Sequence, residues 1–222
     1  MKLVHRDLGR QIAFDNYKSC EWIIESPKLF SKYLQELYRQ SEGEEGNFIL
    51  SDEDKEISID KYVEVIVNPF CVNINDKKIL NKLYTQLAEL AYAEDMYLLT
   101  QEIQSKLKDY VFQLEHMGSY ILEMDSEVDA TAIFKVLGVR IDNYSENFFE
   151  NINLYIKVIT ELLKKKVIVF INLKSFLEKD QIKQLTETAI HNEVRLLFLE
   201  NHQRDFSADF TRYIIDKDGC EI

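Results

Sequence analysis

Glycine and proline are scarce in this 222-residue chain, which contains 6 Gly and 2 Pro. This low usage predicts long regular elements and argues against a loop-rich fold. The three cysteines form no CxxC pair, so we expect reduced thiols, not a disulfide framework or a zinc site. No apolar run reaches the ~18 residues that a membrane span needs, and the first residues lack the apolar stretch of a signal peptide. These absences favour a cytoplasmic protein without a membrane partner.

Positive charge is scarce as well. The chain has 27 Lys and Arg against 39 Asp and Glu, which gives a formal net charge of −12. Taken alone, this balance argues against a nucleic-acid partner, because DNA affinity comes mainly from neutralised phosphates. Hydrophobic residues make up 46% of the chain, with 13 Phe and 12 Tyr, so it can bury a substantial core and disorder is not expected.

Both ends of the chain predict an α/β fold. Residues 20–24 and 62–67 are typical of short strands, and Ser26 followed by Pro27 is a typical helix start. Residues 167–171 and 194–199 are unbroken apolar runs, as expected for strands buried on both faces, and a helix is predicted at about 180–190 between them. Strand–helix–strand at this length predicts a parallel sheet with a right-handed crossover.

Other segments between these strands have simpler signatures. A short helix is predicted over residues 130–137, closed by Gly138, and a longer one follows Ser145 as its cap. The segment from Glu42 to Asp60 carries eight acids and one lysine, and we expect an exposed loop with short extended pieces.

The segment from Asp76 to about Met117 contains no Gly and no Pro, and its apolar residues recur at helical spacing. It predicts one very long helix or two stacked ones, which would extend beyond a compact domain at ~1.5 Å per residue. A second copy of the chain is the simplest partner for its apolar stripe. We therefore predict an α/β domain from residues 1–75 and 130–222, and a helical extension over residues 76–129.

A phosphate-binding loop would need glycines between a buried strand and its helix. After the strand at 167–171 the chain continues Leu173-Lys174-Ser175-Phe176. The Lys-Ser pair matches the end of that motif, but no glycine precedes it. No Gly lies between Val139 and Asp218, so no bound nucleotide is predicted.

Residue patterns for catalysis are weak. The four histidines have no metal-ligand spacing, and there is no G-x-S-x-G and no cysteine with a local partner signature. Glu53-Asp54-Lys55 offers the carboxylates and lysine of a nuclease, but in a polar loop, where a solvated charge run is the simpler interpretation. We predict that the chain is not an enzyme, with a metal-dependent nuclease as the alternative.

An acidic turn follows the predicted helical extension. Glu123, Asp125, Glu127 and Asp129 alternate along it, and carboxylate oxygens without His or Cys suit calcium or magnesium. The turn is not an EF-hand, because Ala130 occupies the place of the required glycine. The alternative is that Asp129 caps the following helix while the other acids face water.

The stretch from Glu161 to Lys183 is rich in basic residues and contains six of them against three acids. Lys164–Lys166 have a structural explanation, because cations favour a helix C-terminus. Lysines on one face can nevertheless hold a phosphate backbone when the net charge is negative.

Several segments, taken in their order along the chain, resemble those of a known protein family. They are Ile23–Glu25, Leu29–Lys32, Ile66–Asn75, Ile133–Asp142, Leu162–Asn172, Phe176–Ile182, Val194–Glu200 and Tyr213–Asp216. Together they resemble the short-form Csn2 proteins, CRISPR-associated proteins of subtype II-A adaptation systems, from about Cys20 to Asp218. The ordered set carries the likeness, since no single motif is as specific as a metal signature.

The resemblance implies a head domain of P-loop-ATPase-like architecture without nucleotide motifs, and a helical leg. It also implies a homotetrameric ring around a lysine-lined hole, with calcium at subunit contacts. Family members bind ends of double-stranded DNA and take part in spacer acquisition with other adaptation proteins and the RNA-guided effector nuclease. We therefore expect a non-enzymatic DNA-end-binding ring. The nuclease and a scaffold that binds no DNA are the alternatives.

The resemblance also assigns candidate residues. Asp125, Glu127 and Asp129 fall on the calcium-associated stretch of the family, with Glu123 just before it. Lys135 and Arg140 match basic family positions, and Lys55 falls in a loop in which members carry several lysines. Together with Lys174 and Lys179 of the basic stretch, they are the candidate DNA contacts.

Overall fold

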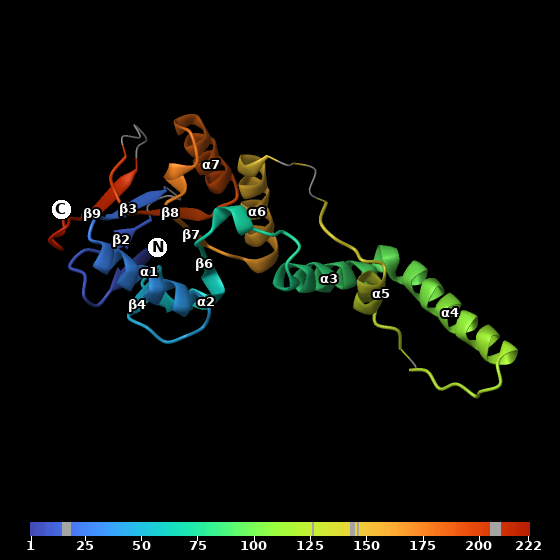
Figure 1. The fold of residues 1–222 in the computed structure, drawn as a ribbon. Coiled ribbons are helices and arrows are strands. Elements are labelled where there is room, and N and C mark those ends of the chain that lie inside the picture. Colours follow the sequence, from blue (N-terminus) through green and yellow to red (C-terminus); the bar gives the residue numbers. More distant parts are fainter. Residues whose placement is uncertain (15–18, 126, 143–144, 146, 205–209) are drawn as a thin grey trace. The chain divides into compact units, whose positions relative to one another are not determined.

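A computed structural model describes residues 1–14, 19–125, 127–142, 145, 147–204 and 210–222. The chain divides into two compact units, an α/β unit of Met1–Ile74 with Asn143–Ile222, and a helical unit of Asn75–Asp142. Figure 1 draws both. No helix among the described residues combines the length and apolarity that crossing a bilayer requires.

The α/β unit is built on a five-stranded sheet in the order β6-β7-β8-β3-β9. All its strand pairs are parallel, which confirms the predicted mixed α/β fold with a parallel sheet. The strands are β3 (Cys20–Ile24), β6 (Val63–Ile66), β7 (Val167–Ile171), β8 (Arg195–Glu200) and β9 (Thr211–Ile215). Every residue of β3 and β7 is buried, as expected for strands covered on both faces.

Three helices accompany this sheet: α1 (Pro27–Ser41), α6 (Phe148–Leu163) and α7 (Lys179–His191). Leu37 of α1 packs in one core cluster with Trp22 and Ile24 of β3. Helices α6 and α7 contact each other and lie on the other side of the sheet from α1 (Figure 1). The N-cap of α6 is Asn147, whose side chain accepts from Phe149 and Glu150 N–H, so the predicted cap at Ser145 was wrong by two positions.

A second, antiparallel sheet in the order β2-β1-β4-β5 packs beside α1. It consists of β1 (Lys2–His5), β2 (Ile12–Ala13), β4 (Phe48–Asp52) and β5 (Lys55–Ile57), and the short helix α2 (Ile59–Tyr62) follows it. The short extended pieces predicted in the acidic segment 42–60 are the paired strands β4 and β5, so the segment is more ordered than the exposed loop we expected around them. Phe48 and Leu50, at alternate positions of β4, point into the core and anchor this segment to it.

The helical unit contains α3 (Lys77–Ala91), α4 (Glu94–Met117) and α5 (Ala130–Val136). Helix α5 packs against α3, and the segment after α5 is hydrogen-bonded to a residue of α3 and to one shortly before it. The Tyr84 hydroxyl donates to the Val139 carbonyl at 2.9 Å, and the Asn75 side chain bonds both backbone groups of Ile141. Residues 130–142 thus lie in the helical unit, whereas the sequence placed them in the α/β domain. Gly138 closes α5 at φ +64°, as predicted.

Candidate nucleic-acid interface

The five predicted DNA contacts separate into four exposed residues and one buried residue. Lys55 lies on β5 and Lys179 begins α7, both in the α/β unit, while Lys135 on α5 and Arg140 belong to the helical unit. None of these four forms an ion pair with another described residue. Their charges are therefore available to an external anion.

Lys174 is the buried exception, in the short 3-10 helix η3 (Leu173–Ser175) after β7. Its Nζ lies 2.8 Å from Glu21 Oε1, and both side chains are fully buried. Its backbone N–H donates to Glu200 Oε1 at 3.1 Å. Burial lowers the pKa of the Lys174 amine, while the Glu21 carboxylate opposes that shift. This placement corrects the prediction, because Lys174 neutralises a carboxylate inside the fold and cannot reach a DNA phosphate from there.

The ion pair belongs to a larger buried group of charges. Arg212 of β9 donates through Nε to Glu21 Oε2 at 2.8 Å, so one carboxylate serves two cations. Glu200 at the end of β8 is fully buried, and burial raises its pKa to about 7. Buried charges are tolerated only when they are paired, so this group holds β3, β8 and β9 to the segment after β7.

The run Lys164–Lys166 also has internal roles. Lys164 ends α6 in a left-handed conformation at φ 56°. The buried Lys165 donates to the Val63 carbonyl at 2.6 Å, and Lys166 lies 2.9 Å from Asp52. The structural explanation is thus supported for this run, and the accessible positive charge of the basic stretch is smaller than its sequence indicates.

The four predicted metal ligands are Glu123, Asp125, Glu127 and Asp129, and all four are exposed. Asp129 caps α5, with Oδ1 accepting from Thr131 N–H at 2.9 Å, as the simpler interpretation predicted. Its pKa is lowered by hydrogen bonds from the Thr131 hydroxyl and N–H. Within the described part of the chain, no three His, Cys, Asp or Glu side chains converge closely enough to hold a metal ion.

The residues of the nuclease alternative form the tip of the β4–β5 hairpin. Glu53 and Asp54 adopt φ of 48° and 60°, and Lys55 begins β5. The Asp54 side chain is 94% exposed and lies 3.7 Å from Lys2. The tip is a solvated turn, in agreement with the simpler interpretation of these charges.

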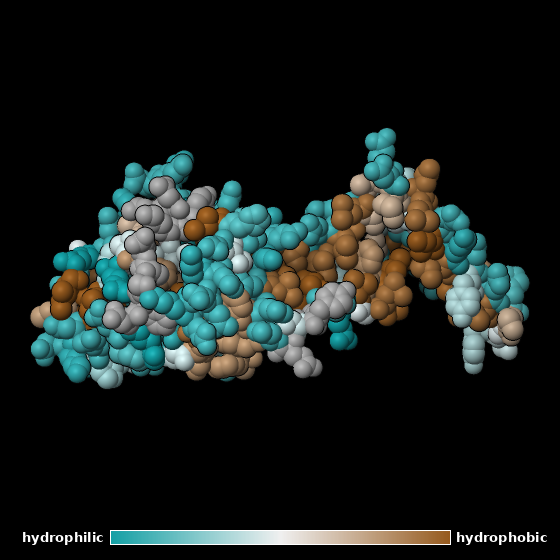
Figure 2. All heavy atoms as spheres, turned by 90° about the horizontal axis from the view of Figure 1, so that it is seen from above, coloured by the Kyte–Doolittle hydropathy of each residue, from teal (hydrophilic) through white to brown (hydrophobic). Residues whose placement is uncertain are grey.

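Large apolar side chains cover the surface of the helical unit. In α4, Leu98, Ile103 and Tyr110 are exposed, and in the segment after it Ile121 is 94% exposed. Figure 2 shows hydrophobic atoms gathered over this unit. An apolar groove of about 270 Å³ lies among α3, α4 and α5, lined by residues that include Leu90, Met96, Ile103, Ile133 and Phe134.

Sequence reasoning missed a cluster of three phenylalanines in the α/β unit. Phe70 lies in the 3-10 helix η2 (Pro69–Cys71) after β6, Phe148 begins α6, and Phe176 follows η3. The Phe70 ring stacks on Phe148 at 4.5 Å between centroids and meets Phe176 edge-on at 4.9 Å. No local pattern links these residues, because only the crossover topology brings their segments together.

Comparison with known proteins places this geometry in context. The family model described as CRISPR-associated protein (Cas_Csn2) matches residues 40–219. A CRISPR-associated protein Csn2 of Streptococcus agalactiae is 27% identical over 201 residues, which cover 88% of this chain and 86% of that protein. A CRISPR-associated protein Csn2 of Enterococcus faecalis is 34% identical over 122 residues, 52% of this chain and 54% of its own length.

Proposed function

The chain belongs to the CRISPR-associated Csn2 family, and on this premise we propose that it is a non-enzymatic protein that binds ends of double-stranded DNA in spacer acquisition. The observation that carries the proposal is that four of the predicted DNA contacts, Lys55, Lys135, Arg140 and Lys179, are exposed and form no ion pair with another described residue. Phosphate contacts by such side chains supply affinity for any DNA sequence.

Assembly is the second part of the proposal, because four basic residues on an acidic chain bind DNA weakly. We propose that copies form a homotetrameric ring, in which each subunit contributes its cations to one hole. The exposed apolar surface of the helical unit supports this, since surfaces of that kind mark protein interfaces. In this assembly the α/β unit is a P-loop-ATPase-like head and the helical unit is a leg.

Calcium is the proposed cofactor at contacts between subunits. Glu123, Asp125 and Glu127 are exposed, and their carboxylate oxygens suit a hard cation. Asp129 already accepts from Thr131, so it retains only part of its capacity for a metal. Ca²⁺ takes six to eight oxygen ligands, so acids from two subunits together fit this cation better than one chain does. Bound calcium would neutralise acids that otherwise repel each other across the contact.

The proposed role needs no nucleotide. The loop from β3 to α1 is Glu25-Ser26, which contains no glycine, and the Lys-Ser pair after β7 has its lysine in an ion pair with Glu21. We propose a cytoplasmic protein that works beside other adaptation proteins and the RNA-guided effector nuclease. Its three cysteines form no disulfide with one another, which is compatible with that compartment.

Electrophoretic binding to linear and to covalently closed circular duplexes tests the proposal, with and without calcium and over a salt series. We expect the linear form to bind preferentially, with an affinity that falls steeply with salt. The combined variant Lys55→Gln, Lys135→Gln, Arg140→Gln, Lys179→Gln should lose most binding. Lys106→Gln is the matched control, because Lys106 is exposed on α4 and paired with Glu102.

The outcomes separate the alternatives. Equal affinity for both topologies would overturn end recognition, and no DNA retention at low salt would favour the scaffold. Cleavage of a plasmid with magnesium or manganese that disappears in Asp125→Ala would establish the nuclease instead.

A further inference from the structure

The three phenylalanines lie at the carboxyl edge of the parallel sheet. Phe70 follows the end of β6 and Phe176 follows the end of β7. Phe148 begins α6, which runs back to the start of β7, so its N-terminus is at the same edge. In open parallel sheets, ligands bind outside the carboxyl ends of the strands. We call Phe70, Phe148 and Phe176 the aromatic edge.

The aromatic edge is accessible and lies apart from the buried core. Phe70 is 59% exposed and Phe176 is 47% exposed, and none of the three belongs to the main core cluster. Phe70 contacts both other rings, one face to face and one edge-on, so the rings hold one another in fixed orientations. This arrangement keeps flat aromatic surface in solvent, where it can accept another planar group.

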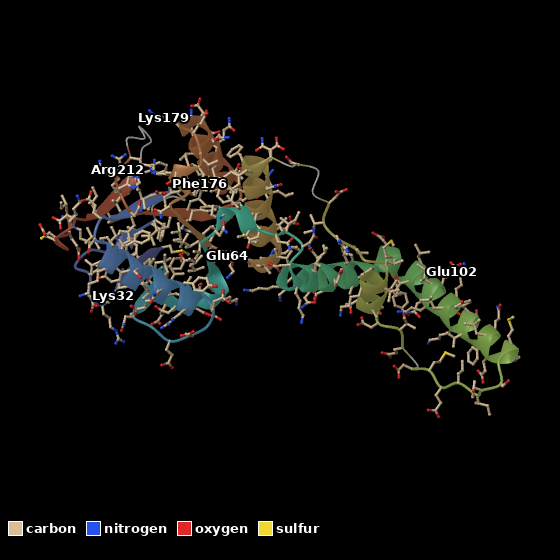
Figure 3. The ribbon with its side chains drawn as sticks, in the orientation of Figure 1. Lys32, Glu64, Glu102, Phe176, Lys179 and Arg212 are labelled. Carbon is tan, nitrogen blue, oxygen red and sulfur yellow. The ribbon has the colours of Figure 1, made fainter. Side chains whose placement is uncertain are left out.

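Two cations lie near Phe176, one through a hydrogen bond to the preceding residue and one three residues further along the chain. Arg204 donates to the hydroxyl of Ser175, the residue before Phe176, at 2.8 Å. Lys179 is exposed at the start of α7, three residues after Phe176 (Figure 3). Glu178, the acid between Phe176 and Lys179 in the sequence, is engaged in a capping box with Gln181. An anionic ligand with planar groups therefore fits both the rings and the charges.

We propose that the aromatic edge stacks unpaired bases at the end of a DNA duplex, with Lys179 and Arg204 contacting the adjoining phosphates. The inference rests on the proposed DNA-end binding and adds to it a preference for frayed or single-stranded termini. Stacking on aromatic rings tolerates every base, because each base has a π-face, so this recognition needs no sequence motif. Bases inside a duplex are not accessible to such rings, which restricts the contact to ends.

Competition binding by fluorescence anisotropy tests the preference. The probes are one duplex with a short unpaired tail at each end and the same duplex closed by hairpin loops. We expect the wild-type chain to prefer the tailed duplex, and Phe70→Ala with Phe176→Ala to reduce that preference roughly tenfold per stacked base lost. Affinity for the closed duplex should stay unchanged. Tyr38→Ala is the control, because Tyr38 is an aromatic residue that is 43% exposed on α1 of the same unit.

Two further measurements keep the inference falsifiable. Phe176→Leu preserves apolar area but removes the aromatic face, so it should lose the preference; full retention would overturn stacking. A 2-aminopurine placed in the tail should change its emission on binding to wild type, and the change should vanish in the alanine variants. Duplex binding without any preference for tails would overturn this inference alone, whereas absence of all DNA binding would overturn the proposed function as well.

Discussion

The sheet of the α/β unit and helix α4 of the helical unit differ in where their large apolar side chains lie. In the α/β unit, apolar strands fill the core, and even the buried charges Glu21 and Lys174 are paired. In α4 of the helical unit, the buried residues are the polar Thr100 and Gln104, while Leu98, Ile103 and other large apolar residues are exposed. The α/β unit thus buries most of its large apolar side chains within itself, whereas the helical unit presents an apolar surface that suits a partner.

The largest expected effect on the stability of the α/β unit comes from breaking its buried ion pair. Lys174→Ala removes one partner of Glu21 and leaves the carboxylate with Arg212 alone. We expect a loss of about 3–4 kcal/mol in the free energy of unfolding, since the buried oxygen Glu21 Oε1 loses its partner and the removed lysine side chain leaves a cavity. Urea unfolding measures it, with the exposed Lys179→Ala as control, for which a change within about 0.5 kcal/mol is expected. Equal midpoints for the two variants would show that the pair contributes nothing.

Glu200 makes the same region sensitive to pH. Its folded pKa is raised from 4.5 to about 7, so the folded state binds more protons than the unfolded state between these values. The stability that this group contributes is therefore present at low pH and is lost as pH rises toward 7, by up to ~3 kcal/mol. Glu200→Gln should gain stability relative to wild type at pH 8 and little at pH 4.5. A gain that does not vary with pH would contradict this assignment.

The helical unit should respond through assembly more than through folding. Ile103→Asp places a charge on the exposed apolar surface of α4, beside the apolar groove. Charge at the centre of an interface weakens association by about 2 kcal/mol or more, so sedimentation should show smaller species at equal concentration. Glu102→Lys is the control, because the Glu102 side chain is 57% exposed and already charged. If Ile103→Asp leaves the mass unchanged, this surface is not the subunit contact.

The smallest expected changes in stability come from substitutions at two helix ends, one in each unit. Lys164 ends α6 at φ 56°, and Gly138 follows α5 at φ +64°. Because glycine adopts this conformation without strain, Lys164→Gly should stabilise the α/β unit by about 0.5–1 kcal/mol, and Gly138→Ala should destabilise the helical unit by a similar amount. Thermal unfolding followed by circular dichroism measures both. A loss of stability in Lys164→Gly, or a gain in Gly138→Ala, would contradict the capping roles.

Local sequence patterns were sufficient for the strands of the parallel sheet and for most helix positions. Unbroken apolar runs at 167–171 and near 194–199 marked strands buried on both faces, and Gly138 marked a helix end. The small antiparallel sheet was not predicted, because Phe48 and Leu50 alternate within a segment dominated by acids. The predicted end of the helical unit, at residue 129, differs from the observed end at Asp142. Tyr84 and Asn75 hold the residues after α5 in this unit, and no local sequence pattern indicates these contacts.

The sequence by itself determined the periodicities, the charge balance and the family, because these depend on residue order alone. Only the tertiary structure decided which cations are free. Lys174 and Lys179 lie in the same basic stretch, yet one is buried against Glu21 and the other is exposed. The same holds for the aromatic edge, whose three rings come from segments far apart in the chain. Such contacts arise from the crossovers of the parallel sheet, which bring distant residues to one edge.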